Sequence, residues 1–114
     1  MHELSVTESI LEITVRHAQD AGAIKVNDLY LVIGDLASIV DDSVQFYWEI
    51  ISQGTLAEGA KLHFERIPPR MRCKDCELEF QPEPGDLCCP TCNGIHLQVL
   101  AGEEFYLSAI DIEK

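Results

Sequence analysis

Basic side chains are scarce in this sequence of 114 residues. Eight lysines and arginines stand against twenty aspartates and glutamates, which gives a formal net charge of −12. A surface of that sign repels the phosphate backbone of DNA and RNA, so we expect no nucleic-acid partner. The charge favours cationic partners and metal ions instead.

Long apolar segments are also missing. No run approaches the roughly eighteen apolar residues of a membrane span, and the opening residues Met1 to Leu4 lack the basic start of a secretory signal. We therefore predict a cytoplasmic protein with no membrane partner. In that reducing compartment cysteines remain thiols, and the odd count of five cysteines fits metal ligation better than a disulfide framework.

Apolar spacing predicts two helices. Apolar side chains recur at three- and four-residue steps from Leu4 to Ala21, and Gly22 ends the run. A second helical run covers residues 44–51, and we expect Asp41 or Asp42 to cap its first turn.

Three strands are predicted from runs of apolar and β-branched residues, at positions 24–33, 60–67 and 105–112. With the helices they indicate a small α/β (α+β) fold, in which a three-stranded sheet is covered by two helices. Residues 1–69 with 100–114 would form this domain. Residues 70–99, which are rich in proline, glycine and cysteine, would form a module inserted before the last strand.

The inserted segment carries two pairs of cysteines with two residues between the members of each pair. These pairs are Cys73/Cys76 and Cys89/Cys92. Four thiolates held by two tight turns can complete a tetrahedron around one metal ion, and a site with no open position is structural rather than catalytic. Metal binding would also stabilise a module that is too small to bury a core of its own.

The identity of this metal is not fixed by the spacing. Zinc is favoured over iron because no other redox-cofactor signature is present, although the same pairs occur in zinc ribbons and in rubredoxin-like iron sites. Cys88 offers a second register with Cys92, but the spacing of Cys89 forms the tighter turn. We expect Cys88 to be a free thiol or a buried filler.

The amino terminus, Met1-His2-Glu3, offers a second set of metal ligands. The α-amino group, backbone nitrogens and the His2 imidazole can approach one ion in a plane, an arrangement that suits Ni(II) or Cu(II). Taken alone, a histidine near a terminus is more often a solvated polar residue. Glu3 is likewise explained by its place near a helix start.

Three features together resemble the HypA/HybF family of hydrogenase maturation factors. They are the opening Met1-His2-Glu3-Leu4-Ser5, the segment Ile33-Gly34-Asp35-Leu36 before the aromatic helix, and the double cysteine motif with Cys89-Pro90-Thr91-Cys92. The resemblance covers essentially the whole chain. Cys88 is an addition to the family pattern.

The resemblance implies a nickel metallochaperone. It would bind Ni(II) at His2, Glu3 and Met1, and would help insert nickel into the large subunit of nickel-iron hydrogenase with the GTPase maturation protein HypB. Cys73, Cys76, Cys89 and Cys92 match the family's zinc ligands, and Asp41 or Asp42 lies near an acidic position associated with nickel. A homodimer, and a supply of nickel to urease, are both left open.

Two other functions remain compatible with the residues. One is an interaction module that binds zinc alone and transfers no metal. The other is a rubredoxin-like electron carrier that binds iron. We do not expect an enzyme, because no nucleophile paired with a base, no carboxylate pair and no open metal site stands out.

Overall fold

The computed structural model describes residues 3–83 and 88–114. The chain divides into two compact units. The first unit comprises Met1–Val32, Ser38–Glu65 and Tyr106–Lys114, and the second comprises Ile33–Ala37 and Arg66–Phe105.

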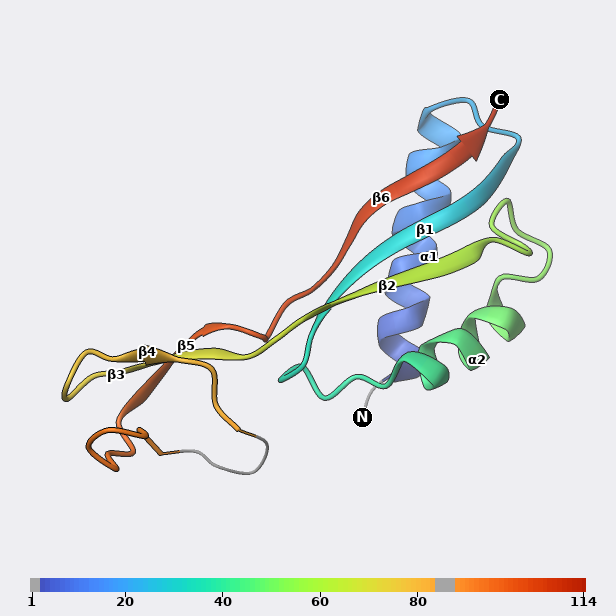
Figure 1. Cartoon of the computed structure of the whole chain (residues 1–114). Coiled ribbons are helices and arrows are strands. Elements are labelled where there is room, and N and C mark those ends of the chain that lie inside the picture. Colours follow the sequence, from blue (N-terminus) through green and yellow to red (C-terminus); the bar gives the residue numbers. More distant parts are fainter. Residues whose placement is uncertain (1–2, 84–87) are drawn as a thin grey trace. The chain divides into compact units, whose positions relative to one another are not determined.

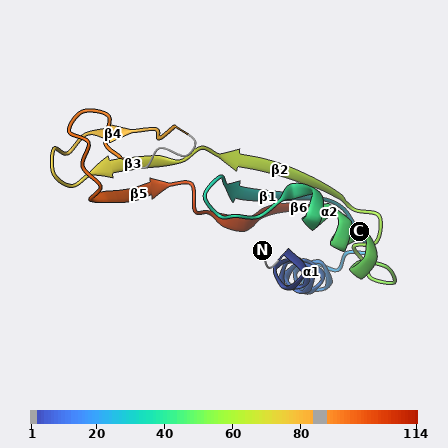
Figure 2. The same ribbon diagram turned by 90° about the horizontal axis from the view of Figure 1, so that it is seen from below.

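The first unit is built on the predicted sheet and its two helices. Its elements are α1 (Glu3–Asp20), β1 (Lys25–Gly34), α2 (Asp41–Ile51), β2 (Lys61–Ile67) and β6 (Phe105–Glu113). The strand order is β2-β1-β6; β1 and β2 run in the same direction and β6 runs against them (Figure 2). Both helices lie on one face of this sheet (Figure 2). The predicted fold class is therefore confirmed.

Helix α1 presents a mixed stripe to the core. Its buried residues are Thr7, Ile10, Thr14 and Ala18. The Thr7 hydroxyl donates to the backbone carbonyl of Glu3, which satisfies a polar group inside the stripe. The apolar spacing predicted Ile10 and Ala18 correctly, but Leu4 and Ala21, at the two ends of the predicted stripe, are exposed. It missed the two threonines, because periodicity counts apolar residues alone.

Helix α2 begins differently from the prediction. Its N-cap residue is Val40, which makes no side-chain capping hydrogen bond, while Asp41 and Asp42 lie within the first turn. The predicted aspartate cap is therefore wrong. In the first turn both carboxylates instead favour the helix through its macrodipole, and the buried side chains Val44 and Trp48 hold the helix in place.

The second unit contains a small sheet that the sequence did not predict. Its strands are β3 (Arg70–Cys73), β4 (Glu79–Phe80) and β5 (Leu97–Ala101), in the order β4-β3-β5 with antiparallel pairing (Figure 1). These strands contain two to five residues, too short for a clear alternating pattern. Met71 pairs with Phe80 on one side and with Val99 on the other.

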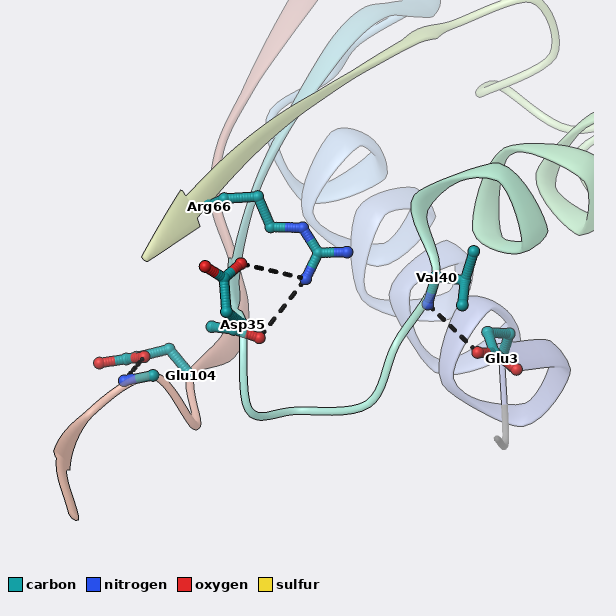
Figure 3. A network of polar contacts seen from close by, with 7 residues as sticks. Glu3, Asp35, Val40, Arg66 and Glu104 are labelled. Carbon is teal, nitrogen blue, oxygen red and sulfur yellow. Dashed lines mark hydrogen bonds and ion pairs between the residues drawn. The ribbon is translucent and has the colours of Figure 1, made fainter. Parts of the chain in front are cut away.

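Within the second unit, two glycines allow the backbone of Ile33–Ala37 to approach the backbone at Gly102 closely. A Cβ at Gly34 would lie 2.0 Å from the Gly102 carbonyl oxygen, and Gly102 itself has a φ of +112°. The Leu36 N–H donates to this same oxygen at 2.7 Å. Figure 3 shows the Arg66 side chain beside this turn, where its Nη1 donates to the Gly34 carbonyl at 3.4 Å. Side chains at either glycine would push the two backbones apart.

Within residues 3–83 and 88–114, no helix is both long and apolar enough to cross a membrane.

Candidate metal centre

Four cysteine side chains converge in the second unit, and we call this group the four-cysteine site. It consists of Cys73, Cys76, Cys89 and Cys92, whose sulfur atoms all lie within 4.8 Å of one another. The Cys73 and Cys92 sulfurs are 3.6 Å apart, and those of Cys76 and Cys89 are 3.5 Å apart. Four sulfurs at the usual 2.3 Å from zinc would be separated by about 3.8 Å. The donor set and its spacing therefore fit one tetrahedral ion.

The first cysteine pair is held by a tight turn at the end of β3. The Cys73 N–H donates to the Leu78 carbonyl at 2.8 Å, and the Glu77 N–H donates to the Cys73 carbonyl at 2.8 Å. Glu77 adopts a φ of +64°, the left-handed conformation that turns the chain back toward β4. This closure points the sulfurs of Cys73 and Cys76 into the same space.

The turn of the second cysteine pair has the same backbone hydrogen bonds at the same residue spacing. The Cys89 N–H donates to the Gly94 carbonyl at 2.9 Å, and the Asn93 N–H donates to the Cys89 carbonyl at 2.9 Å. Asn93 has a φ of +58°, matching the residue at the same place in the first turn. Cys89 thus occupies the position that Cys73 has in its own turn. This settles which register of the second motif enters the site, and Cys88 is not among the four converging sulfurs.

Gly94 leaves room for the sulfurs. A Cβ at this position would lie 3.2 Å from the Cys92 sulfur and 2.9 Å from Oδ2 of Asp75. Asp75 in turn lies 3.2 Å from Nδ1 of His96. The His96 ring faces this carboxylate and is not part of the converging group.

Backbone amides help to set the charge of the thiols. Hydrogen bonds from the N–H groups of Cys92 and Thr91 lower the pKa of Cys89 to about 7. At Cys92 the Gly94 N–H acts in the same direction, but the neighbouring thiols of Cys73 and Cys89 outweigh it and raise the pKa of Cys92 to about 12. A first proton therefore leaves readily from Cys89, and the remaining protons have to be displaced by a cation.

Of the three predicted nickel ligands, the structure describes one. Met1 and His2 lie outside the described residues. Glu3 is described, and its Oε2 accepts a hydrogen bond of 3.2 Å from the backbone N–H of Val40, directly before Asp41 (Figure 3). The start of α1 is thereby linked to the start of α2. Local sequence patterns could not reveal this contact, because 37 positions separate the two residues.

The chain is similar to hydrogenase maturation factors along nearly its whole length. Residues 1–112 match the HypA family, described as "Hydrogenase/urease nickel incorporation, metallochaperone, hypA". A hydrogenase maturation factor HypA of Dehalococcoides mccartyi is 43% identical over 113 residues, covering 99% of this chain and 95% of the relative. The HypA protein of Geotalea uraniireducens is 38% identical over 113 residues, with 99% and 100% covered.

Two solved structures share the fold. The solution structure of the nickel metallochaperone HypA from Helicobacter pylori aligns with a TM-score of 0.68 and 23% identity, over 99% of this chain and 98% of the other. A second solution structure, of a HypA protein, aligns with a TM-score of 0.72 and 24% identity over 98% and 96%. At this identity the two structures support the fold alone.

Proposed function

The chain belongs to the HypA family of hydrogenase maturation factors, and we propose on this basis that it binds Ni(II) at its amino terminus and delivers the ion to a nickel-iron hydrogenase large subunit. The family description as a nickel-incorporating metallochaperone supports this proposal most directly. In the proposal the GTPase maturation protein HypB assists the transfer. We also propose that the protein works in the cytoplasm.

The proposed nickel ligands are Met1, His2 and Glu3. An amine, backbone nitrogens and an imidazole form the nitrogen-rich set that Ni(II) prefers over a tetrahedral arrangement. Few side chains take part, so the ion can be released to a recipient. The carboxylate of Glu3 is kept near the start of α2 by Val40, which supports a ligand position close to the helix ends.

The proposed role of the four-cysteine site is structural, with Zn(II) as its ion. Four thiolates leave no position for a water or a substrate. The matched turns around Cys73 and Cys89 support this assignment, since they present all four sulfurs at distances suited to one ion. In this proposal, residues 70–99 form the zinc module, and residues 1–69 with 100–114 form the nickel-binding domain.

Metal content after nickel loading tests both assignments. Purified protein is incubated with excess Ni(II), desalted and analysed for nickel and zinc by elemental mass spectrometry. We expect His2→Ala to lose nickel and keep zinc, because only the imidazole of the nitrogen set is removed. His17→Ala is the matched control, since it removes an exposed histidine of α1 and should leave both metals unchanged.

The same measurement separates the rival functions. An interaction module without metal transfer would bind zinc alone, even in the unaltered protein. An electron carrier would be isolated with iron in the four-cysteine site and would absorb visible light. Unchanged nickel binding in His2→Ala would refute the amino-terminal site.

A further inference from the structure

Helix α2 exposes two large apolar side chains on the side turned away from the core. Phe46 is 59% exposed and Ile50 is 53% exposed, and they lie one helical turn apart. On the buried side of the same helix, Val44 and Trp48 are each 1% exposed. Single exposed apolar residues are common, but an aromatic and an aliphatic side chain stacked along one helix face are typical of a surface that another molecule covers.

A cleft of about 730 Å³ lies along the flank of this helix, and we call it the α2 cleft. Its walls come from α2, from the segment that leads into β2 and from the first residues of β2, and they include Trp48, Glu49, Gln53, Glu58, Lys61 and His63. The indole N–H of Trp48 is buried and has no hydrogen-bond partner among the described residues. Such a group is stabilised by an incoming acceptor.

The lining of the α2 cleft includes two carboxylates, Glu49 on α2 and Glu58 in the segment before β2. Between Lys25 and Lys61 the chain has no lysine or arginine. Glu49 accepts from the Gln45 side-chain amide at 3.3 Å, and Glu58 accepts from the Gly54 N–H at 2.7 Å. In the part of the chain that the structure describes, neither carboxylate forms an ion pair.

The part of the lining that belongs to β2 contains no carboxylate. It carries Lys61 and His63, and the His63 ring lies 2.9 Å from Oδ1 of Asp28. A cation that enters the cleft is therefore attracted by Glu49 and Glu58 and repelled by Lys61. This places the electrostatic attraction next to Phe46 and Ile50, because Glu49 belongs to the same two turns of the helix.

We propose that the outward face of α2, formed by Phe46, Ile50 and the α2 cleft, docks a basic amphipathic segment of a partner protein. Apolar side chains of that segment cover Phe46 and Ile50, and an arginine or lysine enters the cleft toward Glu49 and Glu58. A second copy of this chain is disfavoured as the occupant, since each copy carries a net charge of −12. The inference does not depend on the nickel role proposed above.

Trp48 provides the signal for a test, because it is the single tryptophan of the chain and it lines the cleft. The probe is a capped, tryptophan-free helical peptide of about eighteen residues, with leucines along one face and lysines beside them. A second peptide carries glutamate in place of each lysine. We expect the basic peptide to change the emission of Trp48 in a saturable way, and the acidic peptide to have no effect.

Two pairs of variants show whether the peptide uses the proposed surface. F46A/I50A should weaken binding about tenfold or more, while I24A/Y106A, which removes two other exposed apolar side chains, should leave it unchanged. Glu49→Gln with Glu58→Gln should also weaken binding. Glu8→Gln with Glu12→Gln changes the net charge equally at exposed positions of α1 and should have a much smaller effect.

Three outcomes would overturn the proposal. Equal losses in both carboxylate pairs would mean that the peptide senses net charge alone. Equal losses in both apolar pairs would show that no particular face is used. A dimer in sedimentation experiments that F46A/I50A dissociates would identify a second copy of the chain as the occupant of this face.

Discussion

The two units of this molecule are stabilised in different ways. The first unit has a conventional apolar core, formed by α1, α2 and their sheet. In it Leu29, Leu31 and Trp48 are almost completely buried. In the second unit the strands are short, and two of its most buried side chains are the cysteines Cys73 and Cys89. Apolar burial can stabilise the first unit alone, whereas we expect the second unit to need a metal ion bound by its four cysteines.

The largest expected effect comes from removing one buried thiolate. Cys73→Ser should release zinc and unfold the second unit, because hydroxyl groups are poor zinc ligands and the unit lacks an apolar core. The first unit should stay folded. Hydrogen exchange measured by mass spectrometry would show lost protection in β3 and β5 but not in α1 or β1.

Cys88→Ser is the matched control for that experiment, since Cys88 lies beside the site but outside the four converging sulfurs. It should keep zinc and normal exchange. A zinc-free Cys73→Ser protein with full protection in the second unit would show that the metal is dispensable there.

The next effect concerns the backbone contact between Gly34 and Gly102. Gly34→Ala places a methyl group 2.0 Å from the Gly102 carbonyl oxygen, so the two segments must separate. We expect a loss of about 3 kcal/mol in the free energy of unfolding, measured by urea denaturation.

Gly59→Ala serves as the comparison for this change. Gly59 has a φ of +77° but no atom within 4 Å of an added Cβ, so only the conformational penalty of about 1 kcal/mol should appear. Equal losses at the two positions would mean that the close approach at Gly34 relaxes without cost.

A smaller effect is expected in the proton balance of zinc binding. With its pKa lowered to about 7, Cys89 in the metal-free protein is mostly protonated at pH 6 and mostly a thiolate at pH 8. Zinc needs the thiolate, so binding at pH 6 should release about one more proton than binding at pH 8. The apparent affinity of the four-cysteine site for zinc should therefore fall as the pH decreases from 8 to 6. Calorimetry in buffers of different ionisation enthalpy measures the difference.

A control variant checks that the additional proton released at pH 6 comes from a thiol of the site. Cys88→Ser should give the same difference as the unaltered protein, because Cys88 is not in the site. A proton count that does not change between pH 6 and pH 8 would contradict the lowered pKa of Cys89.

The smallest effect concerns the two cysteine turns. Asn93 suits the left-handed conformation of its turn, whereas Glu77 adopts a φ of +64° at a cost of about 1 kcal/mol. Glu77→Asn should therefore stabilise the zinc-bound second unit by a few tenths of a kcal/mol. The gain is reduced because the Glu77 carboxylate also accepts from Arg72 at 2.9 Å in an exposed ion pair.

Exchange protection of β3 and β4 would measure this gain. Asn93→Glu gives the reverse change in the second turn and should lower protection by a comparable amount. If both substitutions leave protection unchanged, the backbone conformation of these turns is determined by the metal rather than by the residue.

Sequence patterns predicted the elements of the first unit well, because long helices and strands repeat their apolar residues many times. They predicted the four cysteines that converge, since two closely spaced pairs have few other geometries. They missed β3, β4 and β5, whose lengths give no periodic signal. The prediction of an aspartate cap for α2 was wrong, because Val40 occupies the N-cap position and both aspartates lie inside the first turn of the helix, which begins at Asp41.

By itself, the sequence determined the fold class, the four cysteines that converge and the family resemblance, all of which rest on local spacing and residue type. The tertiary structure decided two things that spacing cannot contain. It brought Glu3 to the start of α2, and it left Phe46 and Ile50 exposed beside a cleft. Each depends on how segments far apart in the chain pack or turn in space, and packing rather than composition sets that geometry.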